Sequence, residues 1–268
     1  MWGGRLCRPA RVLALALLVV GFAVLPACSR KLAPAKPPVG IKSAATEQPA
    51  AAAKSEGVQT TSVHPGVYYE CEEGMPAPGA PRVTFKWYVS GAKVRIEGPP
   101  SPLGRAKMPD EVPLSPGEVT TSILRWDAGV FYALAPHRMM YLEDKLAPRE
   151  PETATPVQVT ATKSSETEQI GPYNCVRYDL APKGETESFR YWVTSEVDLG
   201  VEMSPAWQMA RVFPPLAEAV GKLPGFPIRW EMRTPDGMVV TTITTIRKED
   251  IADSLFEVPA GYKKTKIR

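Results

Sequence analysis

Hydrophobic and polar residues alternate with a period of two along much of the chain, which predicts β-strands with one buried face. In residues 83–90, VTFKWYVS, this alternation places Val83, Phe85, Trp87 and Val89 on one face. Gly91-Ala92 then turns the chain, and residues 93–97, KVRIE, alternate again with Val94 and Ile96 directed inward. The two segments predict a hairpin.

Similar runs continue towards the C-terminus. Three of them fill 119–143, where Asp127-Ala128-Gly129 and Pro136-His137 separate them and predict a meander. Further strands are expected at 157–163, 166–170, 174–180 and 188–194, with a turn at Lys183-Gly184. The segment PIRWEMRTPDGMVVTTITTI predicts a last hairpin, with Asp236-Gly237 as its turn pair.

Two segments interrupt this rhythm. Residues 98–118 hold six prolines and predict a long surface loop. Residues 204–225 have helical spacing, with Ser204 as the N-cap, and Pro214-Pro215 divides them into two short helices. About ten strands and one helical insert predict a mainly β (α+β) fold. We expect a strongly curved antiparallel sheet, an unclosed half-barrel, wrapped around the proline-broken helix that covers its concave face.

The N-terminus has a different composition. Arg5, Arg8 and Arg11 precede an apolar run from Val12 to Leu25 that has the length of a signal-peptide core. Leu25-Pro26-Ala27-Cys28 resembles the lipobox of bacterial lipoproteins, in which the peptide is cut before the cysteine and the cysteine carries lipid. The resemblance implies lipidation at Cys28 and a membrane anchor. The alternative is an ordinary signal peptide or signal anchor, with Cys28 incidental.

The residues after Cys28 are rich in Ala, Pro, Lys, Ser and Thr up to position 64, and such a segment cannot bury enough surface to fold. We therefore divide the chain into a signal peptide (1–27), a lipidated cysteine with a disordered tether (28–64) and one folded domain (65–268). A tether of this composition has a root-mean-square reach of roughly 30–35 Å. Ser29, in place of an aspartate, favours the periplasmic face of the outer membrane over the inner membrane.

The charge balance argues against nucleic-acid binding. The chain has 32 Lys and Arg and 29 Asp and Glu; removal of residues 1–27, with three arginines and no acid, leaves 29 of each. The pI of 8.6 therefore derives from the removed peptide. Beyond the anchor only Cys71 and Cys175 remain. In an oxidising compartment they either form a disulfide or stay two separate buried thiols.

Candidate catalytic chemistry is scarce. The histidines are His64, in the tether, and His137, in a Pro-His-Arg turn; neither CxxC nor HExxH spacing occurs, so we expect no metal site and no cofactor. Cys175 would need His137 as its base to act as a nucleophile. The pairs Glu72-Glu73 and Glu249-Asp250 are interpreted as solvated charges in turns. We expect no enzyme.

The C-terminal segment 246–264 carries a further resemblance. Asp253-Ser254-Leu255-Phe256, Val258-Pro259 and Gly261-Tyr262 are similar to the ending of LolA-like bacterial envelope proteins, most closely domain-of-unknown-function family 4412. Ile170-Gly171, Cys175 and Tyr178 fit a segment of the same family, with one extra residue before the cysteine. The resemblance implies a half-barrel around helices, a fold in which related carriers hold acyl chains.

We therefore expect an envelope lipoprotein that binds a hydrophobic ligand, a lipid or a lipoprotein acyl chain, between sheet and helix. The candidate lining residues are Phe85, Trp87, Tyr132, Trp207, Phe213 and Trp230. The alternative for these aromatic residues is an ordinary filled core, and the protein is then an envelope interaction or sensing module without a ligand. The sequence leaves the oligomeric state open.

Overall fold

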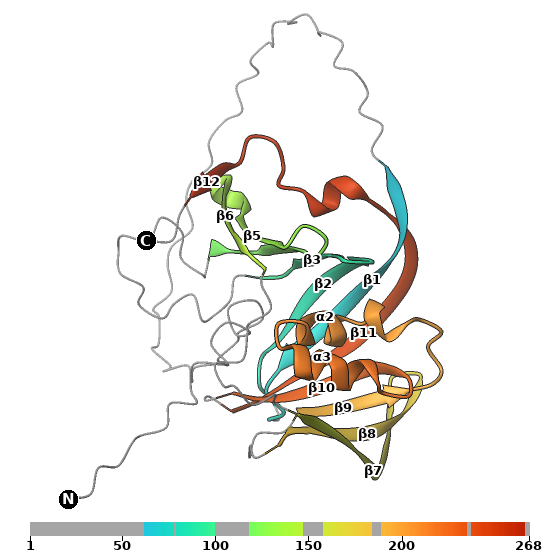
Figure 1. Ribbon diagram of the computed structural model, residues 1–268. Coiled ribbons are helices and arrows are strands. Elements are labelled where there is room, and N and C mark those ends of the chain that lie inside the picture. Colours follow the sequence, from blue (N-terminus) through green and yellow to red (C-terminus); the bar gives the residue numbers. More distant parts are fainter. Residues whose placement is uncertain are drawn as a thin grey trace, which may run out of the picture.

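The computed structural model describes residues 62–77, 79–99, 118–146, 158–183, 189–234 and 237–265 (Figure 1). The predictions for the signal peptide, Cys28, nearly all of the tether and most of the proline-rich segment 98–118 fall outside these residues. They stay predictions.

A single 12-stranded sheet contains every strand of the described residues, in the order β12-β6-β5-β4-β3-β2-β1-β11-β10-β9-β8-β7. All neighbours are antiparallel except β12 and β6, which are parallel. The strands are β1 (Val63–Gly74), β2 (Arg82–Ser90), β3 (Lys93–Glu97), β4 (Thr121–Arg125), β5 (Val130–Ala135), β6 (Met140–Lys145), β7 (Val159–Ile170), β8 (Tyr173–Pro182), β9 (Phe189–Thr194), β10 (Phe226–Thr234), β11 (Gly237–Ala252) and β12 (Lys263–Thr265).

The sheet is strongly curved and open, as predicted. Figure 1 shows β7–β10 at its lower end and β3–β6 at its upper end, with β1, β2 and β11 between them. The edge strands β7 and β12 do not pair with each other. The pairing of β1 with β11 runs from Val63 and Ala252 to Gly74 and Val240, with an irregularity between Glu70 and Cys71. This pairing joins the N-terminal strands to the C-terminal strands in one surface.

Two short helices, α2 (Pro205–Ala210) and α3 (Pro214–Gly221), cover the inner face of the sheet (Figure 1). The Ser204 side chain accepts a hydrogen bond from the backbone N–H of Ala206, which confirms the predicted N-cap. Pro214 begins α3, so the predicted break is confirmed as well. The helix ends at Gly221 rather than at Gly225. Gly225 lies instead directly before β10, where a Cβ would come within 2.4 Å of the Thr194 carbonyl oxygen.

The opposite, outer face is covered at the upper end by the C-terminal segment. The 3-10 helix η5 (Asp253–Phe256) places Phe256, which is 1% exposed, against Ile123, Leu134 and Ile251. The backbone carbonyl of Leu255 accepts a hydrogen bond from Arg95. After η5 the chain adds β12 to the sheet beside β6. The residues that carry the family resemblance therefore cover this outer cluster.

Several predictions need correction. The strands expected at 157–163 and 166–170 are one strand, β7, with an irregularity between Lys163 and Thr167. The central strand β1 was not expected, and it begins at Val63, so His64 belongs to the sheet and not to a tether. Glu72 and Glu73 lie in β1, and Glu249 and Asp250 in β11, rather than in turns. Gly237 pairs with Thr234, so the last hairpin connection is 235–236, outside the described residues.

The Asp253 carboxylate joins three segments where β1 begins. It accepts hydrogen bonds from Ser62 Oγ (2.6 Å) and Lys93 Nζ (2.6 Å), and His64 Nε2 lies 3.0 Å away. These contacts, with the Lys93 and Ser62 hydrogen bonds foremost, hold the pKa of Asp253 well below its ordinary value of 3.8. The charged form therefore stabilises the fold above about pH 4, and this contribution is lost as the pH falls through the lower, folded-state pKa.

We predict that Asp253→Asn lowers the urea midpoint of unfolding at pH 7. It should also weaken the decrease in that midpoint between pH 4 and pH 2, because the variant has no carboxylate to protonate at this position. Urea unfolding monitored by tryptophan fluorescence measures both effects. Asp250→Asn, on the exposed end of β11, is the control and should leave the midpoint at pH 7 nearly unchanged. An Asp253→Asn midpoint equal to that of the wild type would contradict this role.

Candidate functional site

The inner face of the sheet is lined by aromatic and aliphatic side chains in register. Tyr69 pairs with Trp87 across β1 and β2, and Cys71 pairs with Phe85. On the other side of β1, Ile243 of β11 lies opposite Cys71. Because side chains on alternate positions of a strand share a face, these residues form one continuous apolar surface under the helices.

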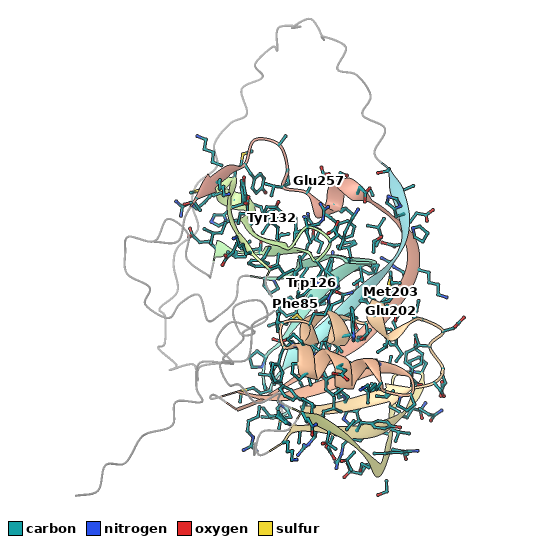
Figure 2. The ribbon with its side chains drawn as sticks, viewed as in Figure 1. Phe85, Trp126, Tyr132, Glu202, Met203 and Glu257 are labelled. Atoms are coloured by element: carbon teal, nitrogen blue, oxygen red, sulfur yellow. The ribbon has the colours of Figure 1, made fainter. Side chains whose placement is uncertain are left out.

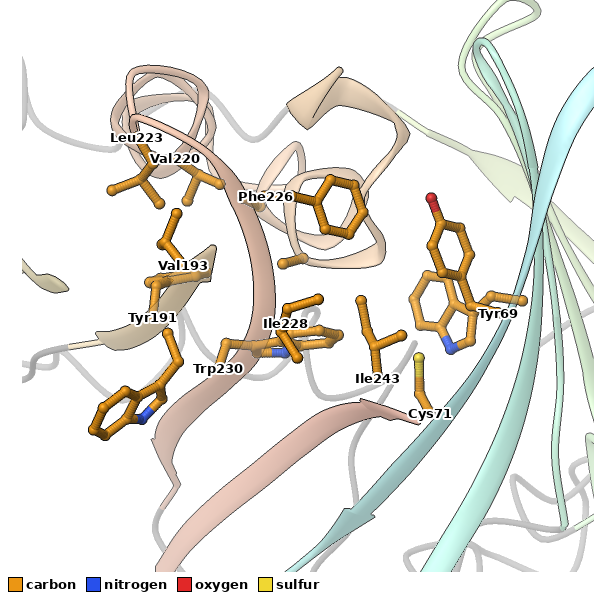
Figure 3. Packing of buried hydrophobic residues seen from close by; sticks show 14 of the residues in the cluster. Tyr69, Cys71, Tyr191, Val193, Val220, Leu223, Phe226, Ile228, Trp230 and Ile243 are labelled. Atoms are coloured by element: carbon orange, nitrogen blue, oxygen red, sulfur yellow. The ribbon is translucent and has the colours of Figure 1, made fainter. Parts of the chain in front are cut away.

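The helical segment packs its own apolar residues against this surface. Phe226, just after the helices, stacks on Tyr69 with ring centroids 6.2 Å apart and planes 16° from parallel. Figure 3 shows Phe226 facing Tyr69, with Ile228, Ile243 and Cys71 beside them. Val220 of α3 and Leu223, which follows it, are 0% and 7% exposed. The covered face and its cover form one cluster.

A few polar contacts fix the cover to the sheet. The Tyr69 hydroxyl donates a hydrogen bond to the carbonyl oxygen of Met203 (2.7 Å), in the 3-10 helix η4 (Val201–Met203) that precedes α2. Gln208 of α2 is 1% exposed. Its Nε2 donates to the carbonyl oxygens of Glu202 (2.7 Å) and of Gly91 (3.3 Å), in the β2–β3 turn.

Arg211, at the end of α2, also connects the cover to the sheet. Its guanidinium carbon lies 4.2 Å from the Trp126 ring centroid and 5.0 Å from that of Trp207. Trp126 follows β4, so this cation–π stack connects the cover to the upper half of the sheet. Desolvation lowers the pKa of Arg211 below its ordinary value, but an arginine stays charged. Figure 2 shows Trp126, Phe85 and Met203 in the same region of the molecule.

The interior is closed in this structure. Tyr69, Trp87, Phe226 and Ile228 are each at most 2% exposed, and Trp230 is 8% exposed. A space wide enough for a water molecule would expose the atoms around it, so these side chains leave no room for an acyl chain. A ligand would have to displace the cover.

The structure brings together five of the six predicted lining residues. Phe85, Trp87 and Trp230 are buried in the inner cluster, and Trp207 and Phe213 pack against it. Tyr132 is a wrong prediction because it lies on the outer face, in the cluster with Ile123 and Phe256. Tyr132 lies in the upper part of Figure 2, near Glu257 and away from Phe85. The neighbouring Phe131 packs against the inner cluster instead, since successive side chains of a strand point to opposite faces.

Glu73 is the unexpected member of this face. It is 2% exposed and continues the alternation of Tyr69 and Cys71 along β1. Its Oε2 accepts a hydrogen bond from the Thr241 hydroxyl (3.1 Å), whereas Oε1 has no hydrogen-bond partner in the described part of the chain. Burial raises its pKa from 4.5 to about 8, and the Thr241 hydrogen bond opposes this only partly. The carboxyl is therefore neutral at pH 7.

The cysteines do not form a disulfide. Cys71 and Cys175 are both free and buried. Cys71 lies on β1 and Cys175 on β8, with β11, β10 and β9 between them. A disulfide requires Cα atoms within about 7 Å, whereas four strand spacings correspond to roughly 19 Å along the sheet. Burial raises the pKa of Cys71 well above its ordinary value and that of Cys175 to about 11, so neither thiol is a reactive thiolate.

A shallow pocket of about 150 Å³ lies at the lower edge of the sheet, lined by β7 and β8 residues that include Thr167, Glu168, Asn174 and Cys175. It is separate from the surface under the helices. Glu168 already pairs with Arg229 there, at 2.9 Å. The pocket therefore has no free charged group of its own pointing to a particular ligand.

Other chemistry is equally limited. No group of three or more potential metal-ligating side chains occurs among the described residues. His137 of the 3-10 helix η3 (Pro136–Arg138) lies beside Glu118 (3.5 Å) at the upper end of the sheet, whereas Cys175 is on β8 at the lower end. A Cys175–His137 pair is thus excluded. No helix in the described ranges is long and apolar enough to cross a membrane.

Comparison with known proteins identifies a family and weak structural likenesses. A family profile described as "Domain of unknown function (DUF4412)" matches residues 77–262. Comparison with curated proteins gives no match. Among solved structures, PNGF-II has 12% sequence identity to this chain and a TM-score of 0.38. The match covers 75% of this chain and 31% of the PNGF-II chain. A LolA superfamily protein from Nitrosomonas europaea has 8% sequence identity and a TM-score of 0.28. This match covers 74% of this chain and 91% of the other. A putative outer membrane lipoprotein-sorting protein domain from Vibrio parahaemolyticus has the same identity and TM-score, with 69% and 85% covered.

The buried state of Glu73 predicts how stability depends on pH. Between pH 5 and pH 8 the unfolded chain loses the Glu73 proton and the folded chain keeps it, so the free energy of unfolding from this group falls by about 1.4 kcal/mol per pH unit. Glu73→Gln should remove this contribution, as measured by urea unfolding across that range. Glu72→Gln, on the opposite face of the same strand, is the matched control. A slope unchanged by Glu73→Gln would show that the carboxyl is ionised in the fold.

Proposed function

The chain belongs to the DUF4412 family of unknown function, and on this premise we propose that it is a non-enzymatic cell-envelope protein that binds a hydrophobic ligand. The ligand, a lipid or the acyl chain of a lipoprotein, would lie between the curved sheet and the α2–α3 cover. The observation that carries this proposal is the construction of the cover. A broad aromatic surface at the centre of the sheet is closed by two helices that belong to no strand pair.

Three features of the cover support its separation from the sheet. α2 has six residues and α3 has eight, lengths at which a helix has little stability of its own. The sheet keeps its strand pairing when the helices move, because neither helix interrupts a ladder. Opening the cover requires the loss of the Tyr69–Met203 and Gln208–Gly91 hydrogen bonds and of the Arg211 stack on Trp126. Local openings of this kind require less free energy than global unfolding.

The second candidate is an interaction or sensing module with a filled core. It is favoured by the closed interior, in which Tyr69 and Ile228 are 0% exposed. In that case the helices are a permanent part of the core, and the protein acts through its surface. The two candidates differ in whether the cover can open while the sheet stays folded.

We further propose that Cys28 carries the lipid anchor and that the segment after it connects the membrane to β1. The apolar run and the Leu-Pro-Ala-Cys sequence support this. The periplasmic face of the outer membrane remains the proposed location. The Asp253 contacts with Ser62 and His64 would then hold the first residues of the domain at the end of the tether.

Variants that weaken the cover test ligand binding. We use the chain from residue 28 with Cys28→Ser, so that no acyl group of its own occupies the site. The probe is a fluorescent fatty acid. Tyr69→Phe removes the hydrogen bond to Met203 and keeps the ring, so it should raise the probe affinity several-fold if opening limits binding. Tyr68→Phe, on the other face of β1, is the control. Absence of probe binding by every variant, including Tyr69→Phe, would favour the filled-core module.

The anchor is tested in the cell of origin. Cys28→Ser should abolish the incorporation of labelled palmitate and release the protein from the membrane fraction or leave it unprocessed. Cys7→Ser, upstream of the proposed cleavage site, should not affect labelling. Continued labelling of the Cys28→Ser variant would contradict the assignment.

A further inference from the structure

Three buried polar atoms on or beside the inner face have no hydrogen-bond partner within the described residues: Glu73 Oε1 on β1, Trp87 Nε1 on β2 and Trp126 Nε1 after β4. The Trp126 ring is already stacked under Arg211. Glu73 and Trp87 are each 2% exposed and lie on neighbouring strands under the cover. A buried polar atom without a partner raises the free energy of the folded state, and such atoms are rare in native interiors. Their presence on the face under the cover therefore calls for an explanation.

Register places both atoms on one strip of the sheet. Glu73 pairs with Val83 and Trp87 pairs with Tyr69, and the Cys71–Phe85 pair lies between these two rows. Trp87 lies four positions after Val83 along β2, which corresponds to roughly 13 Å. The Cys71–Phe85 row between them has no charged side chain, so one polar group of a ligand would meet either Glu73 or Trp87.

Both atoms are hydrogen-bond donors. An indole N–H can only donate. The Glu73 carboxyl is neutral at pH 7, and the Thr241 hydroxyl donates to its Oε2. The proton of the carboxyl is therefore on Oε1, where it faces no acceptor. Each of these two donors therefore lacks a hydrogen-bond acceptor.

From this arrangement we infer that Glu73 and Trp87 form the polar contacts of the ligand site and select a neutral lipid with ester carbonyl oxygens, such as an acylglycerol group. The inference rests on the proposed function, since the cover must open for the ligand to enter. An ester carbonyl supplies a strong acceptor at low desolvation cost. A fatty acid anion would instead bury a charge beside Glu73 and Trp87. The neighbouring charged residues of β1 and β2, Glu72 and Lys86, lie on the outer face, and Arg211 of the cover is already stacked on Trp126 and Trp207.

The matched ligands for the test are 1,2-dioctanoylglycerol, which is ester-linked, and 1,2-dioctylglycerol, which is ether-linked. They differ only in the two carbonyl groups. Displacement of a fluorescent apolar probe from the chain from residue 28 with Cys28→Ser measures both affinities. We expect the ester to bind about tenfold more tightly, the effect of one good buried hydrogen bond.

Variants assign this preference to the two side chains. Trp87→Phe keeps a ring and removes the N–H, and Glu73→Leu removes the carboxyl; each should reduce the ester-to-ether ratio to about half of its value or less. Glu73→Gln should preserve the ratio, because an amide N–H can donate in place of the acid. Glu72→Gln should leave it unchanged. Circular dichroism checks that each variant is folded, and Trp87→Phe and Glu73→Leu test the inference independently.

The outcomes separate the two proposals. If neither glycerolipid displaces the probe from the wild type or from Tyr69→Phe, both the ligand site and the proposed function are wrong. If both lipids bind equally well and no variant changes the ratio, hydrophobic binding stands and the roles of Glu73 and Trp87 are overturned. An ester-to-ether ratio that falls to about half or less in Trp87→Phe and in Glu73→Leu, and is kept in Glu73→Gln, supports the inference.

Discussion

The pairing of β1 with β11 is the interaction on which the rest of the molecule depends. β1 also pairs with β2, so this one strand connects β2–β6 in the upper half of the sheet to β7–β11 in the lower half. Without it, β2–β6 and β7–β11 would be two separate meanders with no common concave face. The inner face that the helices cover exists only because these two halves meet at β1.

Each face of this sheet is covered by a different segment at a different end. The helices cover the inner face, where Tyr69, Trp87 and Phe226 meet. The C-terminal η5 segment covers the outer face, where Phe256 packs on Ile123. The η5 cover is held by the Asp253 contacts and by β12, which is part of the sheet. The α2–α3 cover has no strand of its own, so it is the part of the core that can move with the least loss of backbone pairing.

Local patterns predicted the local elements well. The β2–β3 hairpin, the β4–β6 meander, the Ser204 cap and the break at Pro214 all follow from side-chain period and backbone chemistry within a few residues. The strand β1 was missed because the adjacent acids at 72 and 73 were interpreted as a turn, although Val67, Tyr69 and Cys71 already alternate. Continuing that alternation by one step would have placed Glu73 inside. The order of the strands could not be predicted, because the position of β1 between β2 and β11 joins residues far apart in the chain.

The sequence predicted part of the inner cluster. Phe85, Trp87, Trp207, Phe213 and Trp230 do share one cluster, but the assignment of Tyr132 depended on which face of β5 is inner, and a short strand with apolar residues on both faces does not settle this. The partnerless atoms of Glu73 and Trp87 could not be predicted at all. Whether a buried polar atom has a hydrogen-bond partner depends on the side chains packed around it, and only the structure shows these.

Amide hydrogen exchange tests most directly whether the cover opens while the sheet stays folded. We predict that the amides of α2 and α3 exchange with a smaller opening free energy than those of β1, β2 and β11. This free energy should also fall less steeply with urea, at concentrations below those that unfold the sheet. If the helix amides exchange at the same rate as those of β1 and with the same dependence on urea, the result would contradict an opening cover. The helices would then be an inseparable part of the core.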